Sequence, residues 1–194
     1  MSRAHLAWDG CHRRLVPLPA YAVRVSARQR LLIVSNRLPL TAKRVSGRWR
    51  GERSSGGLVA AMAPLMSQMH GLWFGWPGDA LSGEPEGRER LMREWEREHG
   101  YVAVEIPARI SRSFYEGYAN DTLWPLLHGF PTRVVFAPES WAAYRDANQR
   151  FADSVLERHR KGDLIWAHDY QLMLVPGMIR ERAPEARIGF FLHI

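Results

Sequence analysis

The sequence is poor in cysteine and has no long apolar run. Cys11 is the single cysteine in 194 residues, which excludes an internal disulfide framework and a zinc site built from cysteines. No apolar run reaches the roughly 20 residues that a membrane-spanning helix needs. The basic N-terminus also lacks the continuous apolar core of a signal peptide. We therefore expect a cytoplasmic protein with no membrane partner.

The composition is that of a folded protein. Hydrophobic residues make up 46% of the chain and charged residues 24%, with 16 Gly and 12 Pro. These proportions exclude collagen-like, low-complexity and disordered chains. A chain of this length can bury a sizeable core, so we expect one folded domain.

The net charge of +7 is concentrated near the N-terminus. Much of the excess of Arg and Lys lies in residues 1–53, where it could hold a polyanion by neutralising phosphates. No nucleic-acid recognition motif accompanies this charge, and acidic residues are interleaved with basic ones from Asp79 onward. We therefore expect small anionic substrates, and not nucleic acid, as partners.

Apolar patterning predicts an α/β fold. Residues 1–29 show no clear period, so we expect a flexible N-terminal extension, followed by a folded domain over 30–194. Apolar runs typical of strands buried on both faces occur at 31–35, 72–76, 101–106, 164–167 and 188–192. Amphipathic helices are predicted between them, at 58–69, 87–99, 139–160 and 170–182. This alternation predicts a Rossmann-like, mostly parallel, doubly wound sheet.

Finer patterns identify one core-facing stripe and two weaker stretches. Trp141, Tyr144, Asn148, Phe151 and Val155 fall on one face of the helix expected over 139–160. The polar, basic stretch 36–53 is typical of a loop or hairpin. Residues 115–128 have weak periodicity, and no helix is predicted there.

The polar residues that follow the strands are the candidates for chemistry, because parallel α/β sheets bind ligands beyond the carboxyl ends of their strands. Arg37 follows the first strand and could hold a phosphate with two parallel hydrogen bonds, or could simply be solvated. Ser54-Ser55-Gly56-Gly57 precedes a helix and fits either a phosphate cradle or a tight loop with a helix cap. The Gly-Lys-Ser/Thr signature of a P-loop is missing.

The fourth predicted strand is followed by His168 and Asp169, and the fifth is followed by His193. Asp169 could accept hydrogen bonds from sugar hydroxyls, or could cap the helix expected to begin at Tyr170. His193 ends the last apolar run and could be either a ligand contact or a satisfied buried histidine. A metal site from His168, Asp169 and His193 matches no established ligand spacing, so no metal is expected.

An aromatic and polar cluster lies in the segment of weak periodicity. Its members are Tyr115, Tyr118, Asn120, Trp124 and His128. Aromatic rings that pack on pyranose faces, with amides taking the hydroxyls, are typical of carbohydrate sites. Aromatic side chains also fill ordinary cores, so both interpretations stay open.

Seven motifs in order resemble the trehalose-6-phosphate synthase family of retaining glycosyltransferases, glycosyltransferase family 20. They are LIVSNRLP at 32–39, SGGL at 55–58, GLWFGWPG at 71–78, YEGYANDTLWPL at 115–126, YRDAN at 144–148, DLIWAHDYQL at 163–172 and RIGFFLHI at 187–194. The resemblance covers residues 31–194. It implies the N-terminal, acceptor-binding half of the two-domain GT-B architecture, without the donor-binding domain and the Pro-Phe-Pro segment that follow in the family.

The resemblance implies glucosyl transfer, with retention, from a nucleotide-glucose such as UDP-glucose to glucose 6-phosphate in trehalose biosynthesis. The leaving diphosphate would take the acceptor proton, so no cofactor, metal or enzyme nucleophile is expected. Because the second domain would supply the cationic clamp on the diphosphate, the isolated chain is expected to be inactive. A homo-oligomer is allowed for the full-length protein.

The resemblance also implies roles for particular residues. Arg37 would hold the 6-phosphate of the acceptor, and Asp169 would bind its hydroxyls. Trp76, favoured over Trp73, would line the acceptor pocket with Tyr115 and Trp124, although Trp124 has packing alone as an alternative. Gly56 and Gly57 would approach the donor diphosphate. His193 would face the transferred glucose, which makes His193 and Asp169 the expected catalytic residues.

Two other functions stay open. A glucosylglycerol-phosphate synthase of the same family would use a different acceptor with many of the same motifs. A non-catalytic module that binds sugar phosphate would use only the half that is present. The donor base is not identified by these residues.

Overall fold

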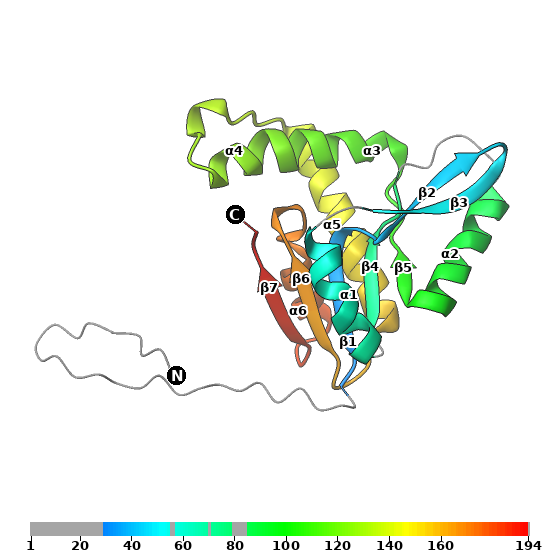
Figure 1. Cartoon of the computed structure of the whole chain (residues 1–194). Coiled ribbons are helices and arrows are strands. Elements are labelled where there is room, and N and C mark those ends of the chain that lie inside the picture. The colour runs from blue at the N-terminus through cyan, green and yellow to red at the C-terminus, as the bar shows by residue number, and fades with distance from the viewer. Residues whose placement is uncertain (1–28, 55–56, 70, 79–84, 194) are drawn as a thin grey trace, which may run out of the picture.

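A five-stranded parallel sheet forms the centre of the protein. The computed structural model describes residues 29–54, 57–69, 71–78 and 85–193 (Figure 1). The strands are β1 (Leu31–Arg37), β4 (Leu72–Trp76), β5 (Tyr101–Ala103), β6 (Leu164–His168) and β7 (Arg187–Phe191), in the order β5-β4-β1-β6-β7. All four pairings are parallel. The predicted α/β fold class is therefore confirmed. The predicted extension lies almost wholly outside the described residues.

The two central pairings of β1 show why its sequence is a continuous apolar run. Leu32 pairs with Leu72 of β4 on one side and with Ile165 of β6 on the other. Leu31 to Asn36 are all buried, since helices cover both faces of the strand. A bulge after Val34 brings the backbone of Leu38 against β4. A Cβ at Gly75 would lie 2.5 Å from the Leu38 nitrogen, so this close approach requires glycine.

Helices cover both faces of the sheet (Figure 1). On one face, Phe74 and Trp76 share a core with α5 (Pro138–Arg158) and α6 (Val175–Arg182). On the other, Trp73 shares a core with α1 (Gly57–Met69) and α2 (Pro85–His99). Four members of the predicted α5 stripe are buried, and the fifth packs against them; the buried ones are Tyr144, Asn148, Phe151 and Val155.

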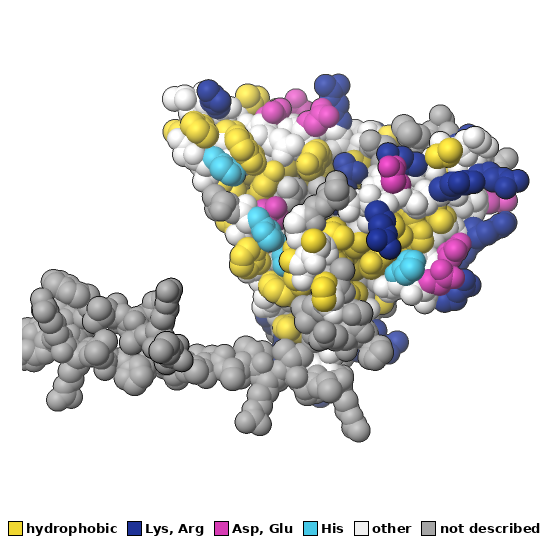
Figure 2. All heavy atoms as spheres, in the orientation of Figure 1, with side chains coloured by type: hydrophobic (Ala, Val, Ile, Leu, Met, Phe, Trp, Pro, Cys, Tyr) yellow, Lys and Arg dark blue, Asp and Glu magenta, His cyan; other side chains and the backbone are white. Residues whose placement is uncertain are grey.

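The stretch predicted as a loop or hairpin is an antiparallel hairpin. It consists of β2 (Leu40–Val45) and β3 (Arg48–Arg53), joined at Ser46 and Gly47, which both have positive φ. Two consecutive residues with positive φ give the turn whose twist suits a tight hairpin. Basic side chains gather over this end of the molecule (Figure 2), among them Arg48 and Arg50.

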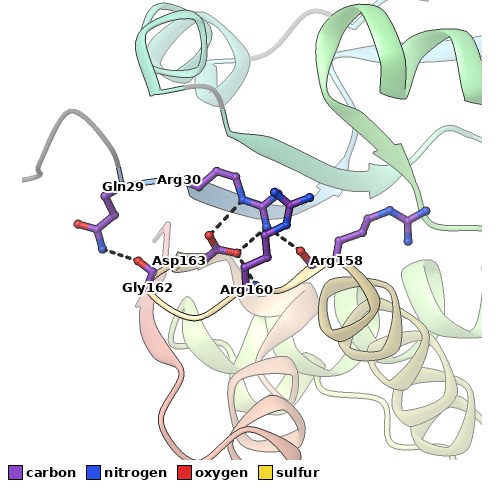
Figure 3. A network of polar contacts seen from close by, with 6 residues as sticks. All are labelled: Gln29, Arg30, Arg158, Arg160, Gly162 and Asp163. Atoms are coloured by element: carbon purple, nitrogen blue, oxygen red, sulfur yellow. Dashed lines mark hydrogen bonds and ion pairs between the residues drawn. The ribbon is translucent and has the colours of Figure 1, made fainter.

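An ion pair joins β1 and β6 at the amino-terminal ends of the parallel strands (Figure 3). Arg30, just before β1, donates two hydrogen bonds to Asp163, just before β6, at 3.1 Å and 2.6 Å. It also donates to the Arg158 carbonyl oxygen at 2.6 Å, while the Arg160 N–H donates to Asp163. Asp163 is only 4% exposed. Burial raises the pKa of this carboxyl, but the hydrogen bonds from Arg30 and Arg160 outweigh burial and hold it below its ordinary value.

The structure corrects three predicted elements. The segment without a predicted helix, 115–128, falls in a π-helical stretch, η1 (Ser113–Leu123), and in α4 (Trp124–Leu127). These elements follow α3 (Ala108–Arg112) and precede the short turn η2 (Pro131–Arg133). The helix predicted over 170–182 is divided into a single turn, η3 (Tyr170–Leu172), and α6. The third strand ends at Ala103 and not at 106.

Within the described part of the chain, no helix is long and apolar enough to cross a membrane.

Candidate functional site

The carboxyl ends of the parallel strands bring four predicted site residues to one edge of the sheet. Arg37 ends β1, Trp76 ends β4, Asp169 follows β6 and His193 follows β7. The η1 segment crosses above this edge and adds Tyr115 to it (Figure 1). The topology therefore gathers side chains that are separated by up to 156 positions in the sequence.

Arg37 lies between two aromatic rings. Its guanidinium carbon is 4.2 Å from the centre of the Trp76 ring and 5.7 Å from that of Tyr115. Contacts of this kind attract a cation to the negative ring face and fix the guanidinium without using its N–H donors. Arg37 is exposed, so these donors are accessible to an anion.

A small basic cavity adjoins Arg37. It has a volume of about 330 Å³ and is lined by Arg37, Thr41, Lys43, Glu52, Arg53 and Ser54. Lys43 pairs with Glu52, the one carboxylate among the lining residues. The cavity therefore keeps a positive balance, which suits a phosphate.

The two tryptophans of β4 have different surroundings. Trp73 is fully buried in the core shared with α1 and α2, where its Nε1 donates to Ser35 Oγ at 2.7 Å. Trp76 points to the other face, is 3% exposed and carries Arg37 on its ring. Among the described residues, none accepts a hydrogen bond from Trp76 Nε1. Of these two tryptophans, Trp76 lies at the candidate site and Trp73 lies in the core on the other face of the sheet.

Asp169 has a strained backbone at the end of β6. Its φ of 77° and ψ of 165° fall in a region that is almost exclusive to glycine. Its Oδ1 accepts a hydrogen bond from the Tyr170 N–H at 2.9 Å, so it does cap the short turn that follows. Strain of this kind persists only where the surroundings over-determine it, and it concentrates at functional sites.

Two side chains of α5 hold the strained segment in place. The Tyr144 hydroxyl donates to the Tyr170 carbonyl oxygen at 2.7 Å and accepts from the Met173 N–H at 3.1 Å. Asn148 Nδ2 donates to the Gln171 carbonyl oxygen at 3.0 Å, and Asn148 Oδ1 accepts from the Leu174 N–H at 3.2 Å. In a continuous helix over 170–182, the carbonyl oxygens of Tyr170 and Gln171 and the Leu174 N–H would bond within the helix. Here they bond to these two side chains, and the helix is divided.

Tyr170 links Asp169 to η1. Its hydroxyl donates to Asn120 Oδ1 at 3.0 Å. Burial, together with the nearby Tyr115 and Asp169, raises the pKa of Tyr170 to about 12, so it stays a neutral donor at ordinary pH. Arg37, Trp76, Tyr115, Tyr170 and Asp169 thus form one connected group.

His168 and His193 meet beside this group. The His168 Nδ1 lies 3.2 Å from the His193 Nε2. His168 is 1% exposed, and burial followed by the proximity of His193 lowers its pKa to about 4. Within the part of the chain that the structure describes, no three His, Cys, Asp or Glu side chains are grouped as metal ligands.

The structure does not bring every candidate into this group. Trp124 is 42% exposed, and its ring stacks on His128 of its own segment with centroids 4.2 Å apart. Gly57 begins α1, and a Cβ there would meet no atom within 4 Å, so nothing among the described residues requires glycine. Gly56 lies outside the described residues.

Arg88 is a positioning residue that the sequence did not reveal. It is 8% exposed, forms an ion pair with Glu105 and donates to the Gly78 carbonyl oxygen at 3.1 Å. A Cβ at Gly78 would lie 3.7 Å from Arg37 Nη1, so Arg88 anchors the loop beside Arg37. It lies on α2, which is rich in charged residues, so no sequence signal distinguished it.

The family model "Glycosyltransferase family 20" matches residues 29–194. The chain belongs to glycosyltransferase family 20. The resemblance seen in the seven motifs is thereby confirmed. A relative from Aspergillus niger, "Alpha,alpha-trehalose-phosphate synthase [UDP-forming] 1", is 43% identical over 171 residues, which cover 84% of this chain and 32% of that protein.

Solved structures of family 20 proteins share the fold. The structure of an alpha,alpha-trehalose-phosphate synthase from Burkholderia xenovorans in complex with glucose-6-phosphate has a TM-score of 0.64 and 29% identity. The match covers 85% of this chain and 33% of the Burkholderia xenovorans chain. An E. coli structure described as "Trehalose-6-phosphate from E. coli bound with UDP-2-fluoro glucose" has a TM-score of 0.65 and 27% identity, over 86% of this chain and 33% of that one. The family 20 chain described here spans about one third of the length of these relatives.

Proposed function

We propose that residues 30–194 form the acceptor-binding, N-terminal domain of a family 20 synthase, with residues 1–29 as an extension. The reaction is the transfer of glucose, with retention, from UDP-glucose to glucose 6-phosphate. The observation that carries the proposal is the Arg37 guanidinium held against Trp76 at the carboxyl edge of the sheet, beside Tyr115 and the strained Asp169. The relatives that bind glucose-6-phosphate and a UDP-glucose analogue support this choice of substrates.

Four residues of the group have parts in holding the acceptor. Arg37 binds the 6-phosphate through the N–H donors that its aromatic contacts leave accessible. Tyr115 and Trp76 shape the pocket around the sugar, and Asp169 accepts hydrogen bonds from its hydroxyls. Trp124, exposed and stacked on His128, would reach the acceptor only by a movement of α4.

The donor side of the reaction falls to Gly56, Gly57 and His193. His193 faces the transferred glucose. Gly57, which begins α1, lies by the diphosphate, and the family resemblance gives Gly56 the same role. The bond from the anomeric carbon to the diphosphate oxygen breaks while the acceptor oxygen bonds to the same face of the sugar. The acceptor proton passes to the leaving diphosphate oxygen, so the step needs no cofactor. Stabilisation of that leaving group falls to cations of the remainder of the family fold.

Calorimetric titration of the 194-residue chain tests the acceptor part of the proposal. Glucose 6-phosphate is expected to bind and glucose to bind at least tenfold more weakly, because glucose lacks the phosphate for Arg37. Glycerol 3-phosphate bound more tightly than glucose 6-phosphate would instead favour a glucosylglycerol-phosphate synthase. Absence of binding by either sugar phosphate would refute the acceptor site.

Turnover is tested separately, with UDP-glucose and glucose 6-phosphate together. The chain by itself is expected to show none, because alignment of the two substrates for reaction needs residues of both the acceptor-binding and the donor-binding domain. A longer protein that contains this sequence and a donor-binding domain is expected to form trehalose phosphate. We place this enzyme in the cytoplasm, without nucleic-acid or membrane partners, and leave its oligomeric state to light scattering of the longer protein.

A further inference from the structure

The contact between His168 and His193 constrains where each ring carries its proton. The two nitrogens that meet, His168 Nδ1 and His193 Nε2, are 3.2 Å apart, and the rings are inclined by 27° with centroids 5.5 Å apart. A neutral imidazole has one N–H donor and one acceptor nitrogen. One of the two meeting nitrogens must therefore donate and the other accept.

The surroundings of His168 differ from those of His193. The His168 ring is buried between Trp166, with centroids 4.7 Å apart, and Phe191, with centroids 6.3 Å apart. Its other nitrogen, Nε2, is buried and has no hydrogen-bond partner among the described residues. His193 is exposed at the end of β7. Only His193 can therefore present its remaining nitrogen to a ligand.

Burial of Nε2 selects one of the two arrangements. If His168 accepted from His193, its own proton would be on Nε2, as a buried N–H donor without a partner among the described residues. Buried N–H groups without a partner are rarer in proteins than acceptors with a spare lone pair. If His168 donates from Nδ1, only a lone pair is left at Nε2. The low pKa of His168 agrees with a ring that stays neutral in either case.

We propose that His168 is a positioning residue that donates its Nδ1–H to His193 Nε2 and so fixes His193 as the Nδ1–H tautomer. His193 then offers a single N–H donor to its ligand. A donor there matches an oxygen acceptor, such as a hydroxyl of the transferred sugar or an oxygen of its diphosphate. The identity of that ligand rests on the proposed function, whereas the tautomer does not.

Nuclear magnetic resonance of the 194-residue chain, labelled with ¹⁵N-histidine, tests the tautomer directly. Two-bond ¹H–¹⁵N correlations at pH 7.5, without any substrate, distinguish protonated from unprotonated ring nitrogens. We expect His193 to carry its proton on Nδ1 and His168 to carry its proton on Nδ1 as well. A proton on His193 Nε2 would overturn the proposal.

Two substitutions of similar size separate positioning from packing. His168→Asn keeps an amide N–H donor near the position of Nδ1 and should preserve the Nδ1–H tautomer of His193. His168→Gln moves that amide by one bond, to the region of Nε2, and should return His193 to the Nε2–H form that free imidazole side chains favour. Both signals are read only from variants with the far-UV circular dichroism of the parent chain. The same His193 tautomer in folded Asn and Gln variants would contradict the proposal.

The wild-type spectrum decides the question even where a variant does not fold. The outcome is also independent of the proposed function, because no substrate is present. A chain that fails to bind glucose 6-phosphate but shows the Nδ1–H tautomer would refute the function and support the positioning role. The reverse result would refute the positioning role alone.

Discussion

The hydroxyl of Tyr144 donates to the carbonyl oxygen of Tyr170 across 2.7 Å. This bond joins the core-facing stripe of α5 to the residue that follows Asp169. Burial, the largest cause, raises the pKa of Tyr144, so its hydroxyl remains protonated and able to donate. The position of the candidate site is therefore set by the core of the domain and not by the loop alone.

Loss of the Tyr144 hydroxyl is expected to weaken both stability and the site. Tyr144→Phe leaves the Tyr170 carbonyl and the Met173 N–H without this partner, so we expect the free energy of unfolding to fall by about 1–3 kcal/mol. Urea denaturation measures this change, and glucose 6-phosphate titration measures the effect on the site. Tyr118→Phe is the matched control, since it removes a hydroxyl from the same aromatic cluster but leaves these two bonds intact. Equal losses in the two variants would contradict the prediction.

The strain at Asp169 predicts an unusual order of stability. Glycine adopts a φ of 77° with a ψ of 165° without steric cost, whereas alanine keeps the strain and loses the carboxylate. We expect Asp169→Gly to be more stable than Asp169→Ala by about 1–2 kcal/mol in urea denaturation. Both variants should lose affinity for glucose 6-phosphate, because both lack the carboxylate. An Ala variant as stable as the Gly variant would show that the backbone at 169 is not strained.

Arg37 is expected to bind the phosphate of glucose 6-phosphate through the arrangement of its N–H donors as well as through its charge. Arg37→Ala should weaken glucose 6-phosphate binding at least tenfold in calorimetry, and Arg37→Lys should recover only part of it. The lysine keeps the charge but loses the fork of donors and the stacking on Trp76. Arg93→Ala, at an exposed pair with Glu89, is the control and should bind as the parent does. A lysine variant with full affinity would reduce the role of Arg37 to that of a point charge.

Much of the sheet could be predicted because its strands are buried on both faces. A strand such as β1, with six consecutive buried residues, leaves a continuous apolar run in the sequence. The η1 segment left no such pattern. Its i→i+5 hydrogen bonds widen each turn, so its buried residues Phe114, Ala119 and Thr122 do not follow the 3.6-residue period.

The parts of the site that could not be predicted depend on long-range contacts. Arg37, Trp76 and Asp169 could be named because they end strands, and the topology gathers strand ends at one edge. The division between η3 and α6 involves bonds from Tyr144 and Asn148, which lie more than 20 positions away in the sequence. Burial of Arg88 depends likewise on Gly78 and Glu105. Such pairings are invisible to local periodicity.

The lowered pKa of His168 predicts a loss of stability in mild acid. The folded protein binds a proton at His168 only near pH 4, whereas the unfolded chain binds one near the ordinary value of 6.5. The unfolded state therefore gains protons first as the pH falls, and the free energy of unfolding should decrease between pH 6.5 and 4, by up to about 3 kcal/mol. His168→Asn should flatten this part of the profile in urea denaturation, while the exposed His99→Asn should not. A parent profile that is flat over this range would contradict a buried, neutral His168.

The Arg30–Asp163 pair, at the amino-terminal ends of β1 and β6, should contribute to the free energy of unfolding at pH 7 and lose this contribution only in acid. Arg30→Ala leaves Asp163, 4% exposed, with the Arg160 N–H alone, so we expect a loss of about 2–4 kcal/mol at pH 7. Because the pKa of Asp163 is lowered in the folded state, its contribution is complete above the ordinary carboxyl pKa and disappears as the pH falls through the lowered one. In Arg30→Ala, where burial is opposed by fewer hydrogen bonds, this acid loss should begin at higher pH. Urea denaturation of Arg30→Ala, Asp163→Asn and the double variant measures the coupling, and strictly additive losses would show that the pair contributes nothing as a pair.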